Sequence, residues 1–473
     1  MEMARGSVEA PVHLDRADTR PLSVQLADQV RSAVTEGVLQ RGERLPSGRS
    51  LAAQLGVSRT VVTEAFQQLY AEGWVEGRHG SGTFVAGGTG ARPSGGRPEP
   101  GPSDPLPAPV TDREGARRAG LVDLRPGAPW VGSVDRAAWR RAWRHAAEQP
   151  LDDSPDPRGQ PRLRALLAEH LRRVRGVRVG PENVMVTGGT GHGLDLVGAG
   201  LVGAGARAGV EEPGYRKAPA VFAARGAVPV PCRVDGEGLV VEELPEDLAA
   251  LYTTPAHQYP LGGRLPVPRR EQLLDWARER GTTVVEDDYD GEFRYDAAPL
   301  PALYGMDPER VVLLGTLSKT LSPDLGIGWL VADPGTVGRL ARLRAELSDR
   351  TPGQPQAATA LLLERGDLDR HLRRMRLEYA RRRRLLKRRL GRWLTGDTAG
   401  LHVLLPLPTE AVRPVVEGAA ERGVLVVDTT HASFGAPPVH GLVLGYGSAG
   451  TQALERGCGV LEGLLGEMGL NVP

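Results

Sequence analysis

The sequence predicts a multidomain chain in which a small α+β domain of helices and one hairpin precedes a large α/β domain. The chain has 473 residues, more than a single hydrophobic core normally supports. Residues 87–120 are dominated by Pro, Gly and Ser, which favours a flexible linker. From residue 121 onward, short Val-rich segments alternate with helical patterns, as in α/β domains with a mainly parallel sheet. The predicted strands include 184–187, 283–287 and 311–315. We therefore place the domains at 12–86 and 121–473.

Composition narrows the possible classes of function. The formal net charge is +1, so any contact with nucleic acid must come from locally clustered charge. Two cysteines, Cys232 and Cys458, are too few for a disulfide framework or a four-cysteine zinc site, and no metal site is predicted. The first residues lack the apolar segment of a signal peptide, and no run approaches 18 apolar residues. We expect a cytoplasmic protein that does not associate with membranes.

The small domain contains two predicted helices that meet at a tight turn. Ser47 can cap the first helix, and Ser58, at the end of the turn, can cap the second, which ends at Gly73. Apolar residues recur at i, i+3, i+4 and i+7 along the second helix, and polar residues cover its other face. That face carries Arg59, Thr60, Thr63 and Gln67. These side chains suit phosphates and base edges. Two short strands at 74–76 and 83–86 complete a hairpin wing.

The motif R-L-P-S-x-R-x-L-A-x-x-L-G-V-S-R-x-V, from Arg44 to Val61, resembles the GntR-type winged helix-turn-helix. L-x-x-x-G and R-x-G-x-G-T-F-V follow it between Leu69 and Val85. The resemblance implies binding to a double-stranded DNA operator. The implied DNA-binding residues are Arg44, Ser47, Arg49, Ser58, Arg59, Thr60, Thr63, Arg78 and Gly80. On the helical pattern alone, the alternative is a small interaction domain with arginines on its solvated face.

A second group of motifs has the layout of a site for pyridoxal phosphate. Asp287 ends a predicted strand, Tyr289 follows two residues later, and Lys319 lies about thirty residues further on. A buried aspartate keeps the pyridine nitrogen protonated. A tyrosine on the same side of the strand can donate to the phenolic oxygen, and a desolvated lysine can form the Schiff base. The alternatives are a surface acidic turn for Asp287 and an ordinary exposed lysine for Lys319.

The neighbouring segments support the cofactor site. Thr190 and Gly191 open an apolar helix after a strand, so their N–H groups and the helix dipole can hold a phosphate. Tyr215 in E-P-G-Y would stack on the cofactor ring, and His257 lies in the segment TTPAHQYP. With the first domain, these motifs resemble the MocR-type branch of the GntR regulators. The resemblance implies a fold type I aminotransferase-like domain that binds pyridoxal phosphate, a head-to-tail homodimer, and a response to the cofactor or a small amino compound.

Three positions depart from that family pattern. Gly326 replaces an arginine that holds the phosphate, and Ser154 replaces a phosphate-contacting tyrosine. Val443 replaces an arginine that binds an amino-acid carboxylate. Each lost charge-assisted contact typically costs about 1.5–3 kcal/mol. We expect weakened cofactor binding, partly restored by Gly326→Arg if that residue can adopt the local backbone.

The expected function is therefore a sequence-specific transcription regulator that senses a small molecule and is not an enzyme. Two alternatives are a regulator whose degenerate aminotransferase-like domain senses another ligand, and an active aminotransferase. The segment 369–393 is rich in arginine. It predicts a long solvated helix, with an auxiliary basic surface for DNA as the alternative interpretation.

Overall fold

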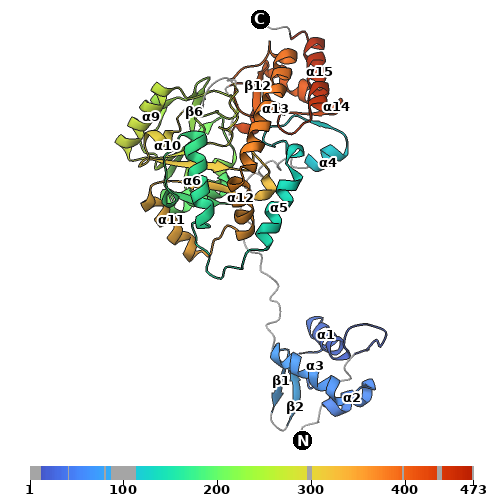
Figure 1. Cartoon of the computed structure of the whole chain (residues 1–473). Helices are drawn as coiled ribbons and strands as arrows, with labels where there is room; N and C mark the ends of the chain where they lie inside the picture. Colours follow the sequence, from blue (N-terminus) through green and yellow to red (C-terminus); the bar gives the residue numbers. More distant parts are fainter. Residues whose placement is uncertain are drawn as a thin grey trace. The chain divides into compact units, whose positions relative to one another are not determined.

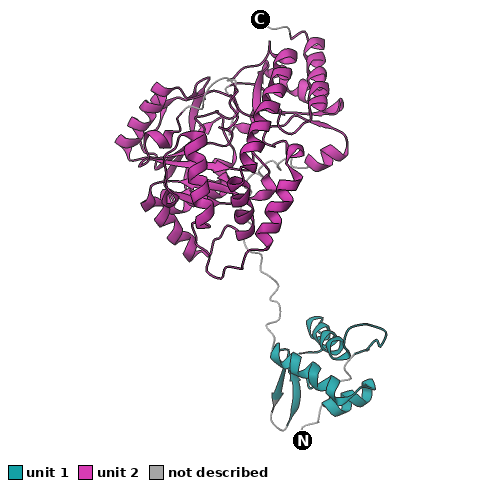
Figure 2. Ribbon diagram, in the orientation of Figure 1, with its two compact units in different colours: residues 1–109 teal, residues 110–473 magenta. Residues whose placement is uncertain are grey.

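In the computed structural model the chain forms two units, Met1–Pro109 and Val110–Pro473, coloured separately in Figure 2. The structure describes residues 12–40, 42–78, 81–86, 113–295, 301–396, 399–433 and 439–470. Gly80 and residues 87–112 of the predicted linker lie outside these ranges. Among the described helices, none is long and apolar enough to cross a membrane. Cys232 and Cys458 are buried and free.

The small unit is a winged helix-turn-helix, as the sequence predicts. It consists of α1 (Leu22–Thr35), α2 (Gly48–Leu55), α3 (Arg59–Ala71), β1 (Val75–Arg78) and β2 (Gly82–Val85). The Ser47 side chain accepts from the N–H of Ser50 at the start of α2, and Ser58 does the same for α3. Gly56 ends α2 in the left-handed conformation, so the chain turns directly into α3. The apolar faces of the three helices share one core with the hairpin.

A mixed eight-stranded sheet forms the centre of the large unit, in the order β4-β11-β10-β9-β8-β5-β6-β7. Its strands are β4 (Val184–Thr187), β5 (Arg207–Glu212), β6 (Val228–Asp235), β7 (Gly238–Leu239), β8 (Ala250–Thr253), β9 (Thr283–Asp287), β10 (Val311–Thr316) and β11 (Gly328–Val331). β7 and β11 are antiparallel to their neighbours, and the other six strands run in one direction. β4 and β9 have the predicted bounds, and β10 extends one residue beyond its prediction.

Helices cover both faces of this sheet (Figure 1). Successive strand residues pack on opposite sides: Val284 belongs to one core and Val285 to the other. The face of Val285 is covered by α7 (Thr190–Val197), α8 (Lys217–Ala224) and α11 (Pro334–Glu346). The face of Val284 is covered by α5 (Arg136–Ala147), α6 (Pro161–Arg175), α9 (Val267–Arg280) and α12 (Gly353–Glu364). This helix–sheet–helix arrangement explains why these strands are apolar throughout their length.

The rest of the large unit adds two smaller sheets and the C-terminal helices. β12 (His402–Pro406), β15 (Gly441–Gly445) and β14 (Val427–Asp428) form an antiparallel sheet, while β13 (Val424–Leu425) pairs in parallel with β3 (Val122–Asp123). Further helices of the large unit are α10 (Leu303–Met306), α13 (Asp367–Leu390), α14 (Thr409–Glu421) and α15 (Thr451–Glu467). α13 confirms the predicted long helix. It buries an apolar face and leaves arginines such as Arg374, Arg381 and Arg388 exposed. Its role as a second DNA surface stays a prediction.

The predicted linker ends earlier than its composition indicated. Residues Arg113–Arg118 form α4, which belongs to the large unit. The Arg113 side chain forms an ion pair with Asp123 at 2.8 Å and donates to the carbonyl oxygens of Arg125 and Pro126. These contacts fix residues 113–118 to the large unit. Because the partners lie further along the chain, the composition of the segment itself does not reveal its helix.

Candidate functional site

The strands that run in one direction bring their carboxyl ends to one edge of the sheet, where ligands bind in open α/β sheets. The segments that follow β4, β5, β9 and β10 carry Thr190, Tyr215, Tyr289 and Lys319 respectively. They enclose a cavity of about 240 Å³. Its lining consists of Pro126, Gly127, Thr190, Tyr215, Arg216, Lys217, Tyr252, Thr254, Tyr259, Asp287, Tyr289, Thr316, Lys319, Leu401, His402 and His431.

Asp287, the last residue of β9, lies at the base of this cavity. Its side chain is 3% exposed, so the surface-turn interpretation is wrong. One carboxylate oxygen accepts from the Tyr252 hydroxyl at 2.7 Å, and the other lies 3.5 Å from the Thr190 hydroxyl. Burial raises the pKa of Asp287 to about 7, against the lowering effect of the Tyr252 hydrogen bond. A buried carboxyl group of this kind is suited to a cationic partner.

Lys319 reaches the cavity from the segment after β10. Its amine donates to the carbonyl oxygen of Gly127. Burial lowers the pKa of Lys319 to about 8, and the nearby positive charge of Arg113 acts in the same direction, while Asp287 opposes both. An ordinary exposed lysine would show no such shift. A larger fraction of this amine is therefore neutral, and nucleophilic, near neutral pH.

Aromatic rings form one wall of the cavity. Tyr215 and Tyr252 are stacked, with ring centroids 6.3 Å apart. Tyr289 also lines the cavity, but its hydroxyl donates to the carbonyl oxygen of His257 at 2.9 Å. The expectation that Tyr289 and Asp287 share a strand face does not hold, because β9 ends at Asp287.

Two predicted cofactor residues do not line the cavity. Gly191 lies in the first turn of α7, directly after Thr190, where helical N–H groups are free to bind an anion. His257 lies behind Tyr289, and its Nδ1 is 3.0 Å from a carboxylate oxygen of Asp290. The prediction of direct cofactor contact by His257 is therefore not supported by its position.

Several cavity residues were not predicted from the sequence. Arg216 and Lys217 line the cavity at the start of α8. They directly follow Tyr215, which was predicted to contact the cofactor. Two positive charges next to that residue could therefore have been predicted to lie in the site. Tyr252 was not predictable, because its contact with Asp287 depends on β8 and β9 being neighbours in the sheet. Arg113 is not among the residues that line the cavity, but its charge acts on Lys319, and the sequence placed it in the predicted linker.

The three departures from the family pattern have distinct structural settings. Gly326 follows the short helix after Lys319 with φ +58° and ψ +37°, in the left-handed region. Ser154 is exposed in a loop. Val443 is 1% exposed in β15 and packs in the apolar core. Neither Ser154 nor Val443 lines the cavity in this chain.

The predicted DNA-contacting residues of the small unit lie on α2, on α3, in the segments before these helices and on the wing. Arg49 on α2 and Arg59, Thr60 and Thr63 on α3 are exposed, and the first two form no ion pair with another described residue. Ser47 and Ser58 act as helix caps at the start of these helices. Arg44 is exposed and pairs with the wing through a bridge to Phe84. The side chain of Arg78, like Gly80, lies outside the described residues.

Comparison with known proteins identifies both units. Residues 22–85 match the family of bacterial regulatory proteins of the gntR type, and residues 131–438 match aminotransferase class I and II. The HTH-type pyridoxine biosynthesis transcriptional regulator PdxR of Corynebacterium glutamicum is 37% identical over 93% of this chain and 95% of its own. The probable rhizopine catabolism regulatory protein MocR of Rhizobium meliloti is 33% identical over 95% and 94%.

Solved structures show the same fold for the large unit. The α-aminoadipate aminotransferase LysN of Thermus thermophilus, complexed with N-(5'-phosphopyridoxyl)-L-leucine, superposes with a TM-score of 0.67. It is 27% identical and covers 75% of this chain and 96% of its own. The fold therefore defines a class: a winged helix-turn-helix joined to a fold type I aminotransferase domain. The chain belongs to the MocR-type GntR regulators and is a DNA-binding transcription regulator.

Proposed function

We propose that this regulator binds pyridoxal phosphate covalently through Lys319, and that the bound cofactor, alone or with a small amino compound, changes its affinity for an operator. The observation that carries the proposal is the convergence of two shifted groups on one cavity. The Asp287 carboxyl, with a pKa of about 7, and the Lys319 amine, with a pKa of about 8, both line it. Two titratable groups with shifted pKa values that line the same cavity indicate a binding site rather than a purely structural role for these residues.

The residues present fit the cofactor. When bound, pyridoxal phosphate would supply an electron-withdrawing ring that reacts with amines. Asp287 would hold a proton at the ring nitrogen, Lys319 would hold the aldehyde carbon, and Tyr215 would pack against the ring. The N–H groups at the start of α7 favour an anion there. Arg216 and Lys217 add positive charge to the same cavity, which offsets in part the missing arginine at Gly326.

The proposal includes the absence of transaminase turnover. An amino-acid substrate needs a cation for its carboxylate at a fixed distance from the lysine. Val443 in the apolar core offers no such group, and we assign the two cations of the cavity, Arg216 and Lys217, to the phosphate. We therefore infer that the large unit serves as a sensor. As the resemblance to MocR-type regulators implies, we also propose that two chains form a head-to-tail dimer through this unit.

The experiment uses the full-length chain and a DNA duplex selected by the wild-type protein from a random library. The chain has three lysines, Lys217, Lys319 and Lys387, so borohydride reduction after addition of pyridoxal phosphate can be mapped by mass spectrometry. We expect label on Lys319 alone and a visible absorbance band that Lys319→Ala removes. Lys319→Ala should keep basal DNA affinity and lose the response to the cofactor, whereas Lys387→Ala should keep both.

A wild-type protein that binds DNA but acquires neither label nor absorbance with excess cofactor contradicts the cofactor proposal. That outcome favours a degenerate sensor of another ligand. The replacement of the family's phosphate-contacting arginine by Gly326 and of its tyrosine by Ser154 also supports this alternative. Release of a keto acid from amino acids would instead contradict the proposed lack of turnover.

A further inference from the structure

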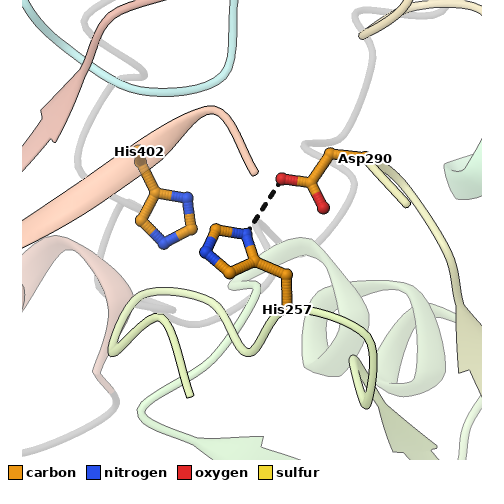
Figure 3. Close-up of side chains that lie close together, drawn as sticks. All are labelled: His257, Asp290 and His402. Atoms are coloured by element: carbon orange, nitrogen blue, oxygen red, sulfur yellow. Dashed lines mark hydrogen bonds and ion pairs between the residues drawn. The ribbon is translucent and has the colours of Figure 1, made fainter. Parts of the chain in front are cut away.

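Three buried side chains with metal-binding atoms meet beside the cavity. His257 follows β8, Asp290 follows β9, and His402 begins β12. Their ligand atoms lie within 4.8 Å of one another, and each residue is at most 3% exposed. Figure 3 shows the two imidazole rings side by side, with His257 turned toward Asp290. The small molecule proposed above does not use this cluster.

The hydrogen bonds assign a proton to each ring. Nδ1 of His257 is 3.0 Å from a carboxylate oxygen of Asp290, so this nitrogen carries the proton and donates. His402 is hydrogen-bonded to the backbone of Pro260, which offers only a carbonyl acceptor, so His402 also donates. Nε2 of each ring is fully buried and has no hydrogen-bond partner among the described residues. Two lone pairs of neutral imidazoles thus lie close together without a donor.

Two buried Nε2 atoms without a donor lower the stability of the folded protein unless both bind the same cation. Buried polar atoms without a partner cost about 1–3 kcal/mol each. The two imidazole ring centroids are 4.4 Å apart, and the backbone of Gly400 packs against the His257 ring. A Cβ at Gly400, which has φ +74°, would lie 2.0 Å from the His257 ring. In metal sites the ligating histidine typically donates its second N–H to a carboxylate or a carbonyl oxygen, as both rings do here.

We propose that His257 and His402 bind one divalent transition-metal ion of the zinc class through their Nε2 atoms, while Asp290 accepts the Nδ1–H of His257 and orients that ring. Imidazole nitrogen favours Zn²⁺, Co²⁺ or Ni²⁺ over Mg²⁺ or Ca²⁺. Two protein ligands leave further positions for water or another small ligand. His402 also lines the cavity, so the ion would lie at the cavity wall and adjust the position of Tyr289, whose hydroxyl is bonded to His257.

The test uses the full-length protein, freed of metal with a chelator and titrated with Co²⁺ alone. We expect one equivalent per chain with a visible d–d absorbance, displaced by Zn²⁺, and no equivalent effect from Mg²⁺. His402→Gln should weaken binding at least tenfold. His371→Gln is the matched control, because His371 is also a buried histidine bonded to a backbone carbonyl but lies outside the cluster.

The wild-type titration decides the proposal without any variant: no saturable Co²⁺ or Zn²⁺ binding overturns it. Equal affinity in His402→Gln and wild type overturns it as well, since binding then occurs elsewhere. Because the probe is the metal alone, a missing pyridoxal phosphate signal would leave this result unchanged.

Discussion

Gly326 occupies the position at which the family has an arginine. Its left-handed backbone explains why the substitution Gly326→Arg is unfavourable. An L-residue in the left-handed region costs roughly 1–2 kcal/mol, and Gly326 has φ +58°. The condition attached to Gly326→Arg, that the residue fit the local backbone, is therefore not met without strain.

We expect Gly326→Arg to lower the free energy of unfolding by about 1–2 kcal/mol and to recover little affinity for pyridoxal phosphate. Chemical denaturation and cofactor titration measure the two effects. Gly326→Asn is the control, because asparagine tolerates the left-handed region better and should lose less stability. A fully stable arginine variant with tighter cofactor binding would show that the loop reorganises.

At Lys319 the lowered pKa predicts the pH dependence of cofactor attachment. Only the neutral amine attacks an aldehyde, and the amine is protonated below its pKa. With a pKa of about 8 in the folded protein, the rate of attachment should rise with pH through about 8 and then level off. An unperturbed lysine would continue to gain reactivity toward a pKa of about 10.4. Stopped-flow absorbance measures this profile, and a continued rise above pH 9 would contradict the desolvated site.

At the level of elements, α3 is the expected reader of DNA. Arg59 is exposed at its N-terminal end, where a recognition helix meets base edges. If Arg59 contacts a base, Arg59→Ala should weaken binding to the selected duplex by about 1–3 kcal/mol. If it contacts only phosphate, binding to every sequence should weaken alike, and the salt slope should fall by about one unit.

Arg20→Ala supplies the charge-matched control, because Arg20 is already paired with Asp18 and Asp28. Fluorescence anisotropy at several salt concentrations separates the outcomes. Unchanged affinity in both Arg59→Ala and Arg49→Ala, with folding intact, would remove α3 as the reader.

The elements differ in how far the sequence determines them. β4, β9 and α3 were predictable, because runs of valine and capping serines are local signals. α4 was not, because Arg113 is held by partners ten or more residues away. The core of the site, Asp287 with Lys319, followed from motif spacing. The hydrogen bond from Tyr252 to Asp287 could not be predicted, because it depends on the order of strands in the sheet, and local sequence patterns do not reveal that order.

At the scale of the molecule, the two units should be separable. The segment 87–112 is rich in Pro, Gly and Ser, so limited proteolysis should cut there first. The small unit has its own apolar core and should stay folded. It should nevertheless bind the selected duplex far more weakly than the intact chain, since a dimer gains from two linked half-site contacts.

Anisotropy with the purified fragment, and with uncut protein at equal concentration, measures the difference. Equal affinities would contradict recognition by a dimer. Intact protein that resists cleavage within 87–112 would contradict the linker prediction.

The lysine amine and the start of the large unit meet in one short loop. The Lys319 amine donates to the carbonyl oxygen of Gly127. The Arg113 side chain donates to the carbonyl oxygens of Arg125 and Pro126, which directly precede Gly127. A ligand that draws the amine away from Gly127 removes one of the contacts on this loop. The first turn of the large unit therefore contacts the same loop as Lys319, and we propose that a ligand bound at Lys319 changes how firmly α4 is held at the start of this unit.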